Sequence, residues 1–301
     1  MPIETQTQAG DFRSGFVAIV GRPNVGKSTL LNRLLGQKVA IVTPKPQTTR
    51  GRILGILTRP DAQVIFVDTP GLHKARSRIN QHMVRAAEAA IEEADVILFL
   101  VDATTGLSAA DRAIAADLGA RSRQLCVVLN KIDKTARAKL LPILAELNGM
   151  LPQHDVVPVS ARTGANCDEL MRQIVGMLPT GPKLYDDETF TDQTERMLVQ
   201  ELVREKVLLL TRQEIPYAVA VTVDKFEDKG KVAVISATIH VERESQKPIL
   251  IGQGGRRIKE IGQAARLEIE AMLDRRVFLE LFVRVQADWT QRESLLREFG
   301  V

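Results

Sequence analysis

The chain has 301 residues, of which 45% are hydrophobic and 26% are charged, and its formal net charge is +4 at pH 7. This length predicts about two domains, and the composition is that of an ordinary globular chain. The two cysteines, Cys126 and Cys167, lie far apart and form no C-x-x-C pattern. That spacing argues against a disulfide framework and a zinc site, and it fits a reducing compartment.

The start of the chain is polar. Residues 1–15 lack the apolar core of a signal peptide, and no apolar run anywhere reaches the ~18 residues of a membrane span. We therefore expect a disordered lead-in over residues 1–14 and no membrane-spanning segment.

The first apolar run, residues 16–20, predicts a buried strand that leads into a phosphate-binding loop. The loop matches G-x-x-x-x-G-K-[ST] at every fixed position, and a helix follows from Thr29. Lys27 can reach the β- and γ-phosphates, and the Ser28 hydroxyl can ligate Mg²⁺. The pattern predicts a nucleoside triphosphate bound by Gly21, Arg22, Pro23, Asn24, Val25, Gly26, Lys27, Ser28 and Thr29.

The loop lies within a basic stretch of the chain. Between residues 12 and 60 there are nine Lys and Arg residues and no Asp or Glu, so this field can serve the triphosphate or face RNA. Within it, residues 46–51 read P-Q-T-T-R-G. A threonine there can coordinate Mg²⁺ and release it after hydrolysis. We expect Thr49 to be this ligand, with Thr48 as the alternative.

The second strand, over residues 64–67, runs into the motif D-T-P-G. Asp68 can hold Mg²⁺ through a water molecule, and the Gly71 N–H can sense the γ-phosphate. The neighbouring residues Thr69, Pro70 and Leu72 join this loop. Leu72 occupies the position at which many small GTPases carry a glutamine that orients the attacking water, so another group must supply that function.

Two further motifs assign the base. Residues 130–133 read N-K-I-D, and the Asp133 carboxylate can accept from guanine N1–H and N2–H₂, a pair that adenine lacks. Asn130 can connect this loop to the phosphate loop, and Lys131 can cover the base plane. Ser160, Ala161 and Arg162 follow another strand, and the Ala161 N–H can meet guanine O6. Together these motifs predict GTP.

Apolar runs alternate with helical stretches through the first 180 residues. The runs occupy 16–20, 64–67, 96–101, 125–129 and 156–159, and the helices 80–93, 109–119, 136–148 and 168–177. Buried strands separated by helices predict an α/β fold with a doubly wound, mostly parallel sheet. The motif loops then share the carboxyl edge of that sheet.

A second, smaller α+β domain follows a Pro- and Gly-containing linker. We expect a helix over 193–212, strands over 217–223 and 232–241, a glycine loop, a helix that stops near Gly262, another that runs through Leu273, and a strand over 277–285. This order is αββααβ. The predicted boundaries are a GTPase domain over 15–179, a linker over 180–195 and the second domain over 196–301.

The glycine loop has the pattern I-G-x-x-G-x-x-I, which resembles the RNA-gripping loop of a type II KH domain. Gly252 and Gly255, between two helices, would let the backbone approach a sugar-phosphate chain. Residues 245–259 hold four basic residues and no acidic one, as expected for a local groove. The candidate RNA-binding residues are Lys247, Ile251, Gly252, Gln253, Gly254, Gly255, Arg256, Arg257 and Lys259.

From residue 15 to residue 299 the chain resembles the Era-like family of bacterial GTPases. The likeness rests on G-R-P-N-V-G-K-S, Q-T-T-R, D-T-P-G, N-K-I-D, S-A-R and V-E-R-E-S-Q-K-P-I-L-I-G, and the single phosphate loop argues against relatives with tandem GTPase domains. The resemblance implies binding near the 3′ end of 16S rRNA, assistance in 30S subunit assembly, and a cytoplasmic location with a fraction peripherally on the inner membrane. No obligate oligomer is implied.

The resemblance also bears on hydrolysis. In GTPases with an apolar residue at the position of Leu72, an asparagine matching Asn24 helps to place K⁺ on the transition state. The predicted catalytic groups are therefore Lys27, Thr49, Gly71 and Asn24, and the intrinsic rate is expected to be slow. We expect GTP to order the loops 47–50 and 69–74 and so to favour RNA binding. The alternative is a signalling GTPase whose second domain binds a protein or the membrane surface.

Overall fold

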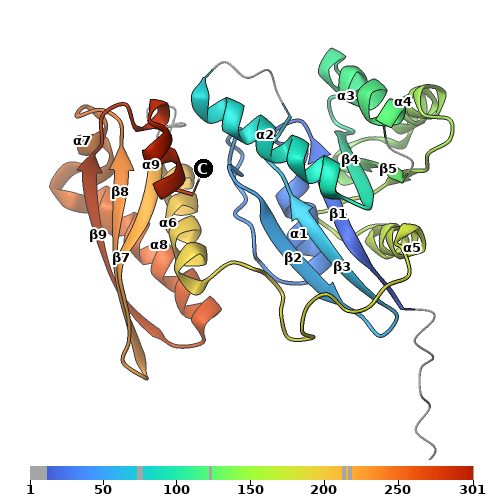
Figure 1. Ribbon diagram of the computed structural model, residues 1–301. Coiled ribbons are helices and arrows are strands. Elements are labelled where there is room, and N and C mark those ends of the chain that lie inside the picture. Colours follow the sequence, from blue (N-terminus) through green and yellow to red (C-terminus); the bar gives the residue numbers. More distant parts are fainter. Residues whose placement is uncertain (1–11, 73–76, 122–123, 212–214, 216–218, 301) are drawn as a thin grey trace, which may run out of the picture. The chain divides into compact units, whose positions relative to one another are not determined.

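The computed structural model describes residues 12–72, 77–121, 124–211, 215 and 219–300 (Figure 1). The chain forms two compact units. The first comprises Met1–Val39, Arg52–His73 and Ala86–Asp192, and the second comprises Ala40–Gly51, Lys74–Arg85 and Gln193–Val301. The domain boundaries expected from the sequence stay a prediction.

The first unit is built on six strands: β1 (Arg13–Gly21), β2 (Ile53–Thr58), β3 (Ala62–Asp68), β4 (Val96–Asp102), β5 (Leu125–Asn130) and β6 (Val156–Pro158). They lie in the order β2-β3-β1-β4-β5-β6, and every neighbouring pair is parallel except β2 and β3. β3, β4 and β5 are buried along their whole length, as apolar runs covered on both faces require. The predicted fold class is confirmed.

Helices cover both faces of this sheet (Figure 1). They are α1 (Lys27–Leu35), the part of α2 (Arg78–Glu93) that belongs to this unit, from Ala86 onward, α3 (Ala109–Arg121), α4 (Arg137–Met150) and α5 (Cys167–Met177). Ile91, Leu118 and Leu147, from α2, α3 and α4, pack with Phe99 and Val127 in one buried cluster. α1 and α5 lie on the other face. The loops that leave the strands therefore gather at one edge of the sheet.

The first unit departs from the sequence expectation at two strands. β2 was not predicted, and it pairs antiparallel with β3 at the edge of the sheet. β1 begins at Arg13, so Arg13 and Ser14 belong to a strand and not to a disordered lead-in; the earlier residues 1–11 lie outside the described part. The start of β1 and the whole of β2 both pair with β3, and the local sequence does not reveal such pairing.

The predicted linker is bound to the first unit for most of its length. The buried Gln63 side chain donates to the Tyr185 carbonyl (2.8 Å) and accepts from the Leu184 N–H (2.7 Å). Further along, the Thr191 hydroxyl donates to the Leu54 carbonyl (2.7 Å). The segment that follows α5 is therefore attached to β2 and β3 and is not an open tether.

The second unit contains α6 (Glu195–Leu210), β7 (Val219–Asp228), β8 (Val232–Val241), α7 (Gln246–Ile251), α8 (Arg256–Leu273), β9 (Arg276–Val285) and α9 (Glu293–Glu298). Its sheet has the order β7-β8-β9, with β7 antiparallel and β9 parallel to β8. Residues of α6 and α8, such as Val203 and Ala265, share one core with Ile235 of β8. The predicted αββααβ order is therefore present.

Two helices of the second unit differ from expectation. α8 continues through Gly262, where the sequence analysis expected a stop. Its apolar stripe continues in Ile261, Ala265 and Ile269, all fully buried, so packing maintains the helix across the glycine. α9 was not predicted. Across the described residues, no helix combines the length and hydropathy needed to cross a membrane.

Both cysteines are buried in the first unit. Cys126 lies on β5 and is fully buried, and Cys167 begins α5 at 7% exposure. Burial raises the pKa of the Cys126 thiol to about 12, and burial also raises the pKa of Cys167. Neither forms a disulfide.

Candidate functional site

The phosphate loop, residues 21–28, has a backbone that needs glycine at two places. Gly21 and Gly26 have φ angles of +148° and +106°. A Cβ atom on Gly26 would lie 2.3 Å from Asn130 Nδ2, and one on Gly21 would lie 2.5 Å from the Leu100 carbonyl oxygen. Side chains are therefore excluded at both positions by conformation and by space. The loop leads directly into the N-terminus of α1, which favours an anion.

Lys27 is buried within this loop, at 6% exposure. Its ammonium donates to the carbonyl oxygens of Gly21 (3.2 Å) and Arg22 (3.1 Å). Burial lowers its pKa to about 8, against an opposing attraction from Asp68. A phosphate oxygen beside this ammonium would add a further negative charge, which would favour the protonated form of Lys27.

Ser28 and Asp68 face each other across the loop. The Ser28 hydroxyl donates to Asp68 Oδ2 (2.6 Å), and Asp68 is fully buried at the end of β3. Thr69 anchors the following turn by donating to the Ile19 carbonyl (2.8 Å). A hydroxyl and a carboxylate oxygen next to a phosphate loop suit a hard cation such as Mg²⁺.

The D-T-P-G turn packs closely on the phosphate loop. The Leu72 N–H donates to the Gly21 carbonyl (3.0 Å), and a Cβ on Gly71 would lie 2.6 Å from Pro23 N. The Leu72 side chain packs against the buried cluster around Phe99. This turn therefore depends on glycine and on an apolar residue after it. The remainder of the predicted loop, His73 and Lys74, lies outside the described residues.

Thr48 and Thr49 belong to the second unit, whereas Ser28 and Asp68 belong to the first. Both threonines are buried, at 9% and 7% exposure. The Thr48 hydroxyl donates to the Lys45 carbonyl (2.7 Å), and the Thr48 carbonyl accepts from Arg204 (2.6 Å). The choice between the two as Mg²⁺ ligand stays a prediction.

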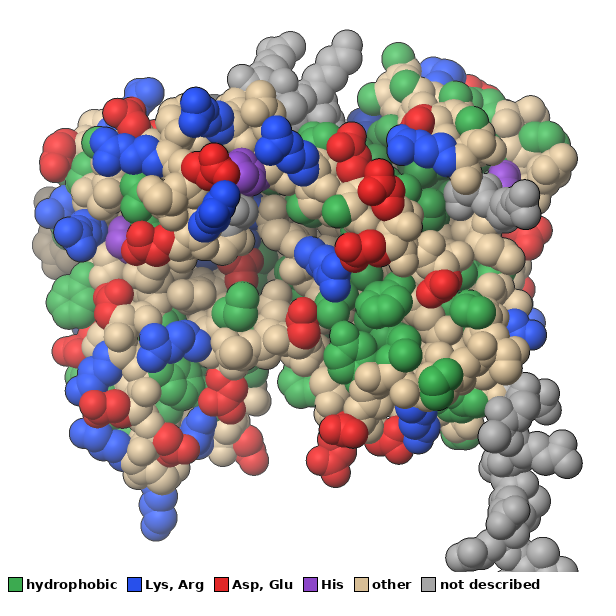
Figure 2. Space-filling view, viewed as in Figure 1, with side chains coloured by type: hydrophobic (Ala, Val, Ile, Leu, Met, Phe, Trp, Pro, Cys, Tyr) green, Lys and Arg blue, Asp and Glu red, His purple; other side chains and the backbone are tan. Residues whose placement is uncertain are grey.

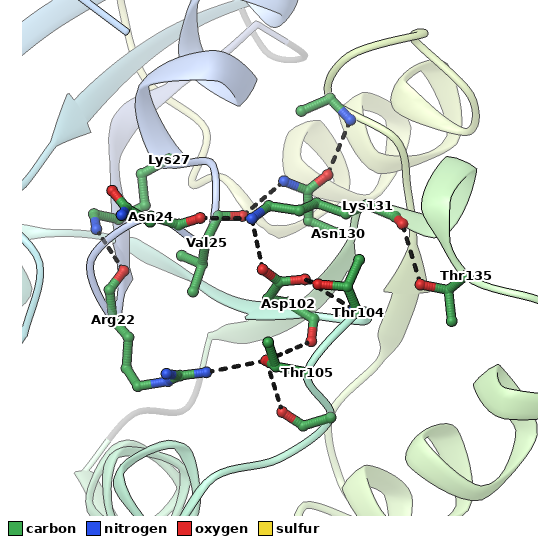
Figure 3. Close-up of polar contacts among 12 residues, drawn as sticks. Arg22, Asn24, Val25, Lys27, Asp102, Thr104, Thr105, Asn130, Lys131 and Thr135 are labelled. Carbon is green, nitrogen blue, oxygen red and sulfur yellow. Dashed lines mark hydrogen bonds and ion pairs between the residues drawn. The ribbon is translucent and has the colours of Figure 1, made fainter. Parts of the chain in front are cut away.

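Asn130 joins three loops at the carboxyl edge of the sheet. Its amide nitrogen donates to the Val25 carbonyl (2.9 Å), and its amide oxygen accepts from the Ala161 N–H (3.0 Å) (Figure 3). From the sequence, the Ala161 N–H is expected to meet guanine O6. In the structure this N–H is directed at Asn130, so the contact with O6 stays a prediction.

Asp133, the carboxylate of the N-K-I-D motif, is exposed and lies beside the loop of residues 160–162. The fully buried Ser160 orients it by donating from its hydroxyl to Asp133 Oδ1 (2.7 Å). Arg33 of α1 fixes the neighbouring loop by donating to the carbonyls of Ala161 (3.2 Å) and Arg162 (2.5 Å). An exposed carboxylate held by a buried hydroxyl is suited to reading the edge of a base.

Two acidic residues at this edge were missed by the sequence analysis. Asp102 ends β4 and accepts from the Lys131 ammonium (2.5 Å), and Asp111, in the first turn of α3, accepts from Arg22 (2.7 Å). Asp102 directly follows a predicted strand, so its place at the carboxyl edge was the available signal. Nothing in the local sequence indicates Asp111.

The glycine loop of the second unit lies between α7 and α8. Gly252, Gly254 and Gly255 all have positive φ angles, of 71°, 59° and 77°. A Cβ on Gly252 would lie 2.9 Å from Arg257 N, whereas those on Gly254 and Gly255 would meet nothing within 4 Å. The outer side of the loop is therefore open to a partner that approaches the backbone.

The predicted RNA-binding side chains differ in exposure. Gln253, Arg256 and Lys259 are exposed, and Lys247, Ile251 and Arg257 are half-buried. Arg257 donates to the Leu210 carbonyl and pairs with Glu260 (3.4 Å), so part of its charge is already used within the unit. Basic and acidic side chains are interspersed over the face drawn in Figure 2. Within residues 245–259, by contrast, all four charged side chains are basic.

Two families match the chain. The family described as "50S ribosome-binding GTPase" matches residues 16–131, and the family described as "KH domain" matches residues 214–290. The first match includes the phosphate loop and ends at Lys131. The second includes the whole glycine loop.

Full-length relatives agree with both matches. GTPase Era of Geotalea daltonii is 49% identical over 290 residues, covering 96% of this chain and 98% of the relative. A crystal structure of Era in complex with MgGDPNP and nucleotides 1506–1542 of 16S ribosomal RNA superimposes with a TM-score of 0.93 at 45% identity, covering 96% and 99% of the two chains. A point variant of Aquifex aeolicus Era bound to GDP·AlF₄⁻ gives the same TM-score at 44% identity and the same coverage. The chain therefore belongs to the Era family of GTPases.

Proposed function

We propose that this GTPase binds the 3′ region of 16S rRNA through its second unit and assists assembly of the 30S subunit. The observation that carries the proposal is the TM-score of 0.93 with an Era chain in complex with that RNA. The loop of positive-φ glycines supports it, since a KH loop needs a backbone that can approach the sugar-phosphate chain.

The test compares two aspartates introduced at equivalent backbone conformations. Gly254→Asp puts a negative charge into the glycine loop, where φ is 59° and a Cβ has open space. Gly230→Asp is the matched control, because Gly230 has φ of 73°, has the same open surroundings and lies in the turn between β7 and β8. We expect Gly254→Asp to weaken binding of a single-stranded RNA with the 16S 3′-terminal sequence at least about tenfold. The control should leave it unchanged.

Binding is measured by fluorescence anisotropy at one stated salt concentration, in the presence of a GTP analogue and of GDP. Tighter binding with the analogue supports a switch in which GTP and RNA favour one state. Equal affinity in both nucleotides indicates a constitutive RNA binder. RNA affinity that is indifferent to Gly254→Asp would favour the alternative, a signalling GTPase whose second unit binds a protein or the membrane surface.

We propose that Mg²⁺ is the metal of the nucleotide site. Ser28 and Asp68 would hold it, with Thr49 or Thr48 as a further predicted ligand, and their hydroxyl and carboxylate oxygens fit its preference. When bound, Mg²⁺ neutralises charge on the β- and γ-phosphate oxygens. The Lys27 ammonium and the Gly71 N–H would stabilise the same developing charge from the protein side.

We also propose that K⁺ assists hydrolysis beside Asn24. The apolar Leu72 cannot orient water, and Asn24 has a left-handed backbone, with φ of 64°, at the rim of the phosphate loop. Single-turnover hydrolysis should be about tenfold faster in KCl than in NaCl at equal ionic strength. Asn24→Ala should abolish that difference, and equal rates in both salts for the parent would exclude the potassium proposal.

The proposed location is the cytoplasm, with a fraction bound peripherally to the inner membrane. Support for it comes from family resemblance. The test is fractionation of cells that produce the chain, with a wash in about 1 M salt that screens surface charges and releases peripheral proteins. If all of the protein is recovered in the soluble fraction before the wash, the proposal of peripheral membrane binding is rejected. The proposal of a cytoplasmic location then stands alone.

A further inference from the structure

The segment from the end of β4 to the first turn of α3, residues 102–111, forms two ion pairs at this edge of the sheet. One is with Arg22 of the phosphate loop, and the other is with Lys131, whose contact with Asn24 of that loop is drawn in Figure 3. Asp102 holds the Lys131 ammonium, and Asp111 holds the Arg22 guanidinium. All four residues belong to the first unit. None of the sequence motifs includes Asp102 or Asp111.

Lys131 is the central member of this arrangement. Its ammonium lies 2.5 Å from Asp102 Oδ2 and 2.7 Å from the Asn24 carbonyl oxygen. One cation therefore joins the base-recognition loop, the end of β4 and the rim of the phosphate loop. Lys131 and Asn24 both have left-handed backbones, with φ of 67° and 64°, which L residues adopt at a cost. The ion pair with Asp102 holds the ammonium that contacts the Asn24 carbonyl.

Asp102 is itself held in one orientation. Its Oδ1 accepts from the Thr104 N–H (2.9 Å) and from the Thr104 hydroxyl (2.6 Å), which leaves Oδ2 directed at Lys131. Burial opposes its ionisation, but the hydrogen bonds from Lys131 and Thr104 hold the pKa of Asp102 below its ordinary value. The carboxylate is therefore charged at neutral pH.

The second contact supports the other side of the loop. Asp111 is fully buried, and its Oδ2 accepts from the Ser108 N–H (2.9 Å) and hydroxyl (2.7 Å). Its Oδ1 accepts from Arg22 Nε (2.7 Å). The phosphate loop is thus held through Asn24 and through Arg22 by one continuous segment.

We propose that Asp102 is a positioning residue of the GTP site. It acts through Lys131, holding the ammonium where it connects guanine recognition to the conformation of the phosphate loop. Asp102 touches neither base nor phosphate in this role. Asp111 supports the loop at Arg22 without involving Lys131. Loss of the Asp102 carboxylate should therefore weaken nucleotide binding, and only as long as Lys131 is present.

A double-mutant cycle on the full chain tests this inference. Asp102→Asn, Lys131→Met and the double variant are compared with the parent for GDP affinity by calorimetry and for dissociation of a fluorescent GDP analogue. Hydrogen bonds to charged groups imply that Asp102→Asn weakens GDP binding by about tenfold to a hundredfold, mainly through faster dissociation. The double variant should bind GDP within about twofold of Lys131→Met alone.

The matched control is Asp117→Asn. Asp117 also pairs with a cation, Arg121, but the pair is exposed on the surface of α3 and does not contact the site. Its GDP affinity should equal that of the parent. Asp102→Glu restores the charge on a longer side chain and should recover part of the lost affinity.

Parental affinity in Asp102→Asn, or losses that multiply in the double variant, would overturn the inference, because Asp102 would then act independently of Lys131. If Asp102→Asn does not fold, Thr104→Val replaces it in the cycle, since it removes the hydroxyl that orients the carboxylate. A weakening of about threefold that disappears in the Lys131→Met background supports the same conclusion, and an unchanged affinity rejects it.

Discussion

The Ser160 hydroxyl donates a 2.7 Å hydrogen bond to the Asp133 carboxylate. Ser160 is fully buried, whereas Asp133 is exposed, so a fixed donor orients an accessible acceptor. This relationship joins the N-K-I-D motif to the loop after β6. It gives the base-recognition carboxylate a defined direction before nucleotide binds, which reduces the conformational entropy lost on binding.

Asp133→Asn should change base specificity. The carboxylate accepts from guanine N1–H and N2–H₂, and an amide nitrogen facing the N2 amine would place two donors together. GDP affinity should fall at least about a hundredfold. Xanthosine diphosphate, which has a carbonyl at C2, should gain affinity for the same variant. Calorimetry with both nucleotides measures the change, and the control is Asp61→Asn at an exposed residue. Unaltered preference for GDP would contradict this assignment.

GDP affinity should decrease as the pH rises above 8. Burial lowers the pKa of Lys27 to about 8, so the ammonium is already charged below that pH. A bound phosphate stabilises the charged form, so binding above pH 8 requires uptake of a proton. Affinity should fall by up to about tenfold per pH unit there. Calorimetric titrations between about pH 7 and 9 measure this slope. Lys27→Arg keeps its charge throughout and should show a flat profile; equal slopes in both proteins would contradict the role of Lys27.

Gly26→Ala should abolish tight nucleotide binding through a collision with Asn130. The added methyl would lie 2.3 Å from Asn130 Nδ2, while one at Gly106 would meet nothing within 4 Å. Both glycines have positive φ, so both variants should lose about 1–2 kcal/mol of stability. Only Gly26→Ala should also lose GDP affinity, by about a hundredfold or more. Calorimetry and urea unfolding separate the two effects, and equal GDP affinity in the two variants would reject the explanation.

Gly262→Ala should stabilise the second unit. Gly262 lies inside α8, its φ is not positive, and an added Cβ would meet Leu281 at 3.4 Å, an ordinary contact. Replacing an interior helix glycine by alanine contributes about 0.5–1 kcal/mol. Urea unfolding monitored by Trp289, the single tryptophan of the chain, reports on this unit. Gly230→Ala, at a φ of 73°, is expected to destabilise the second unit. If Gly262→Ala had the lower free energy of unfolding of the two variants, α8 would be interrupted at Gly262.

The buried strands were predictable because strands covered on both faces are apolar along their length. β2 was missed since Gly55 interrupts its apolar run. The structure explains that glycine: a Cβ there would lie 2.5 Å from Leu35 and 2.7 Å from Leu31, so α1 packs directly on the strand. The predicted helix stop at Gly262 is wrong for a related reason, because local propensity favours a stop where tertiary packing maintains the helix.

The sequence predicted which motifs form the site, but it did not predict which side chains pair with one another there. The motif loops do meet at one edge of the first sheet, as the alternation of strands and helices indicated. The pairs Lys131–Asp102 and Arg22–Asp111 join segments 29 and 89 residues apart in sequence. Such pairs depend on strand order and loop conformation, which a single sequence does not specify. α9 was missed similarly: it is followed by Phe299, whose ring meets Trp289 edge-to-face with the centroids 5.2 Å apart, a tertiary contact that the local sequence does not indicate.

The burial of Cys126 and Cys167 determines how readily their thiols react with oxidants and electrophiles. Burial raises the pKa of the Cys126 thiol to about 12, so the thiolate, which is the reactive form, is scarce at neutral pH. Alkylating reagents and peroxide should therefore spare Cys126 while β5 stays covered. Modification of Cys126 therefore requires that the sheet opens, so the rate of its modification reports how often the first unit unfolds around β5.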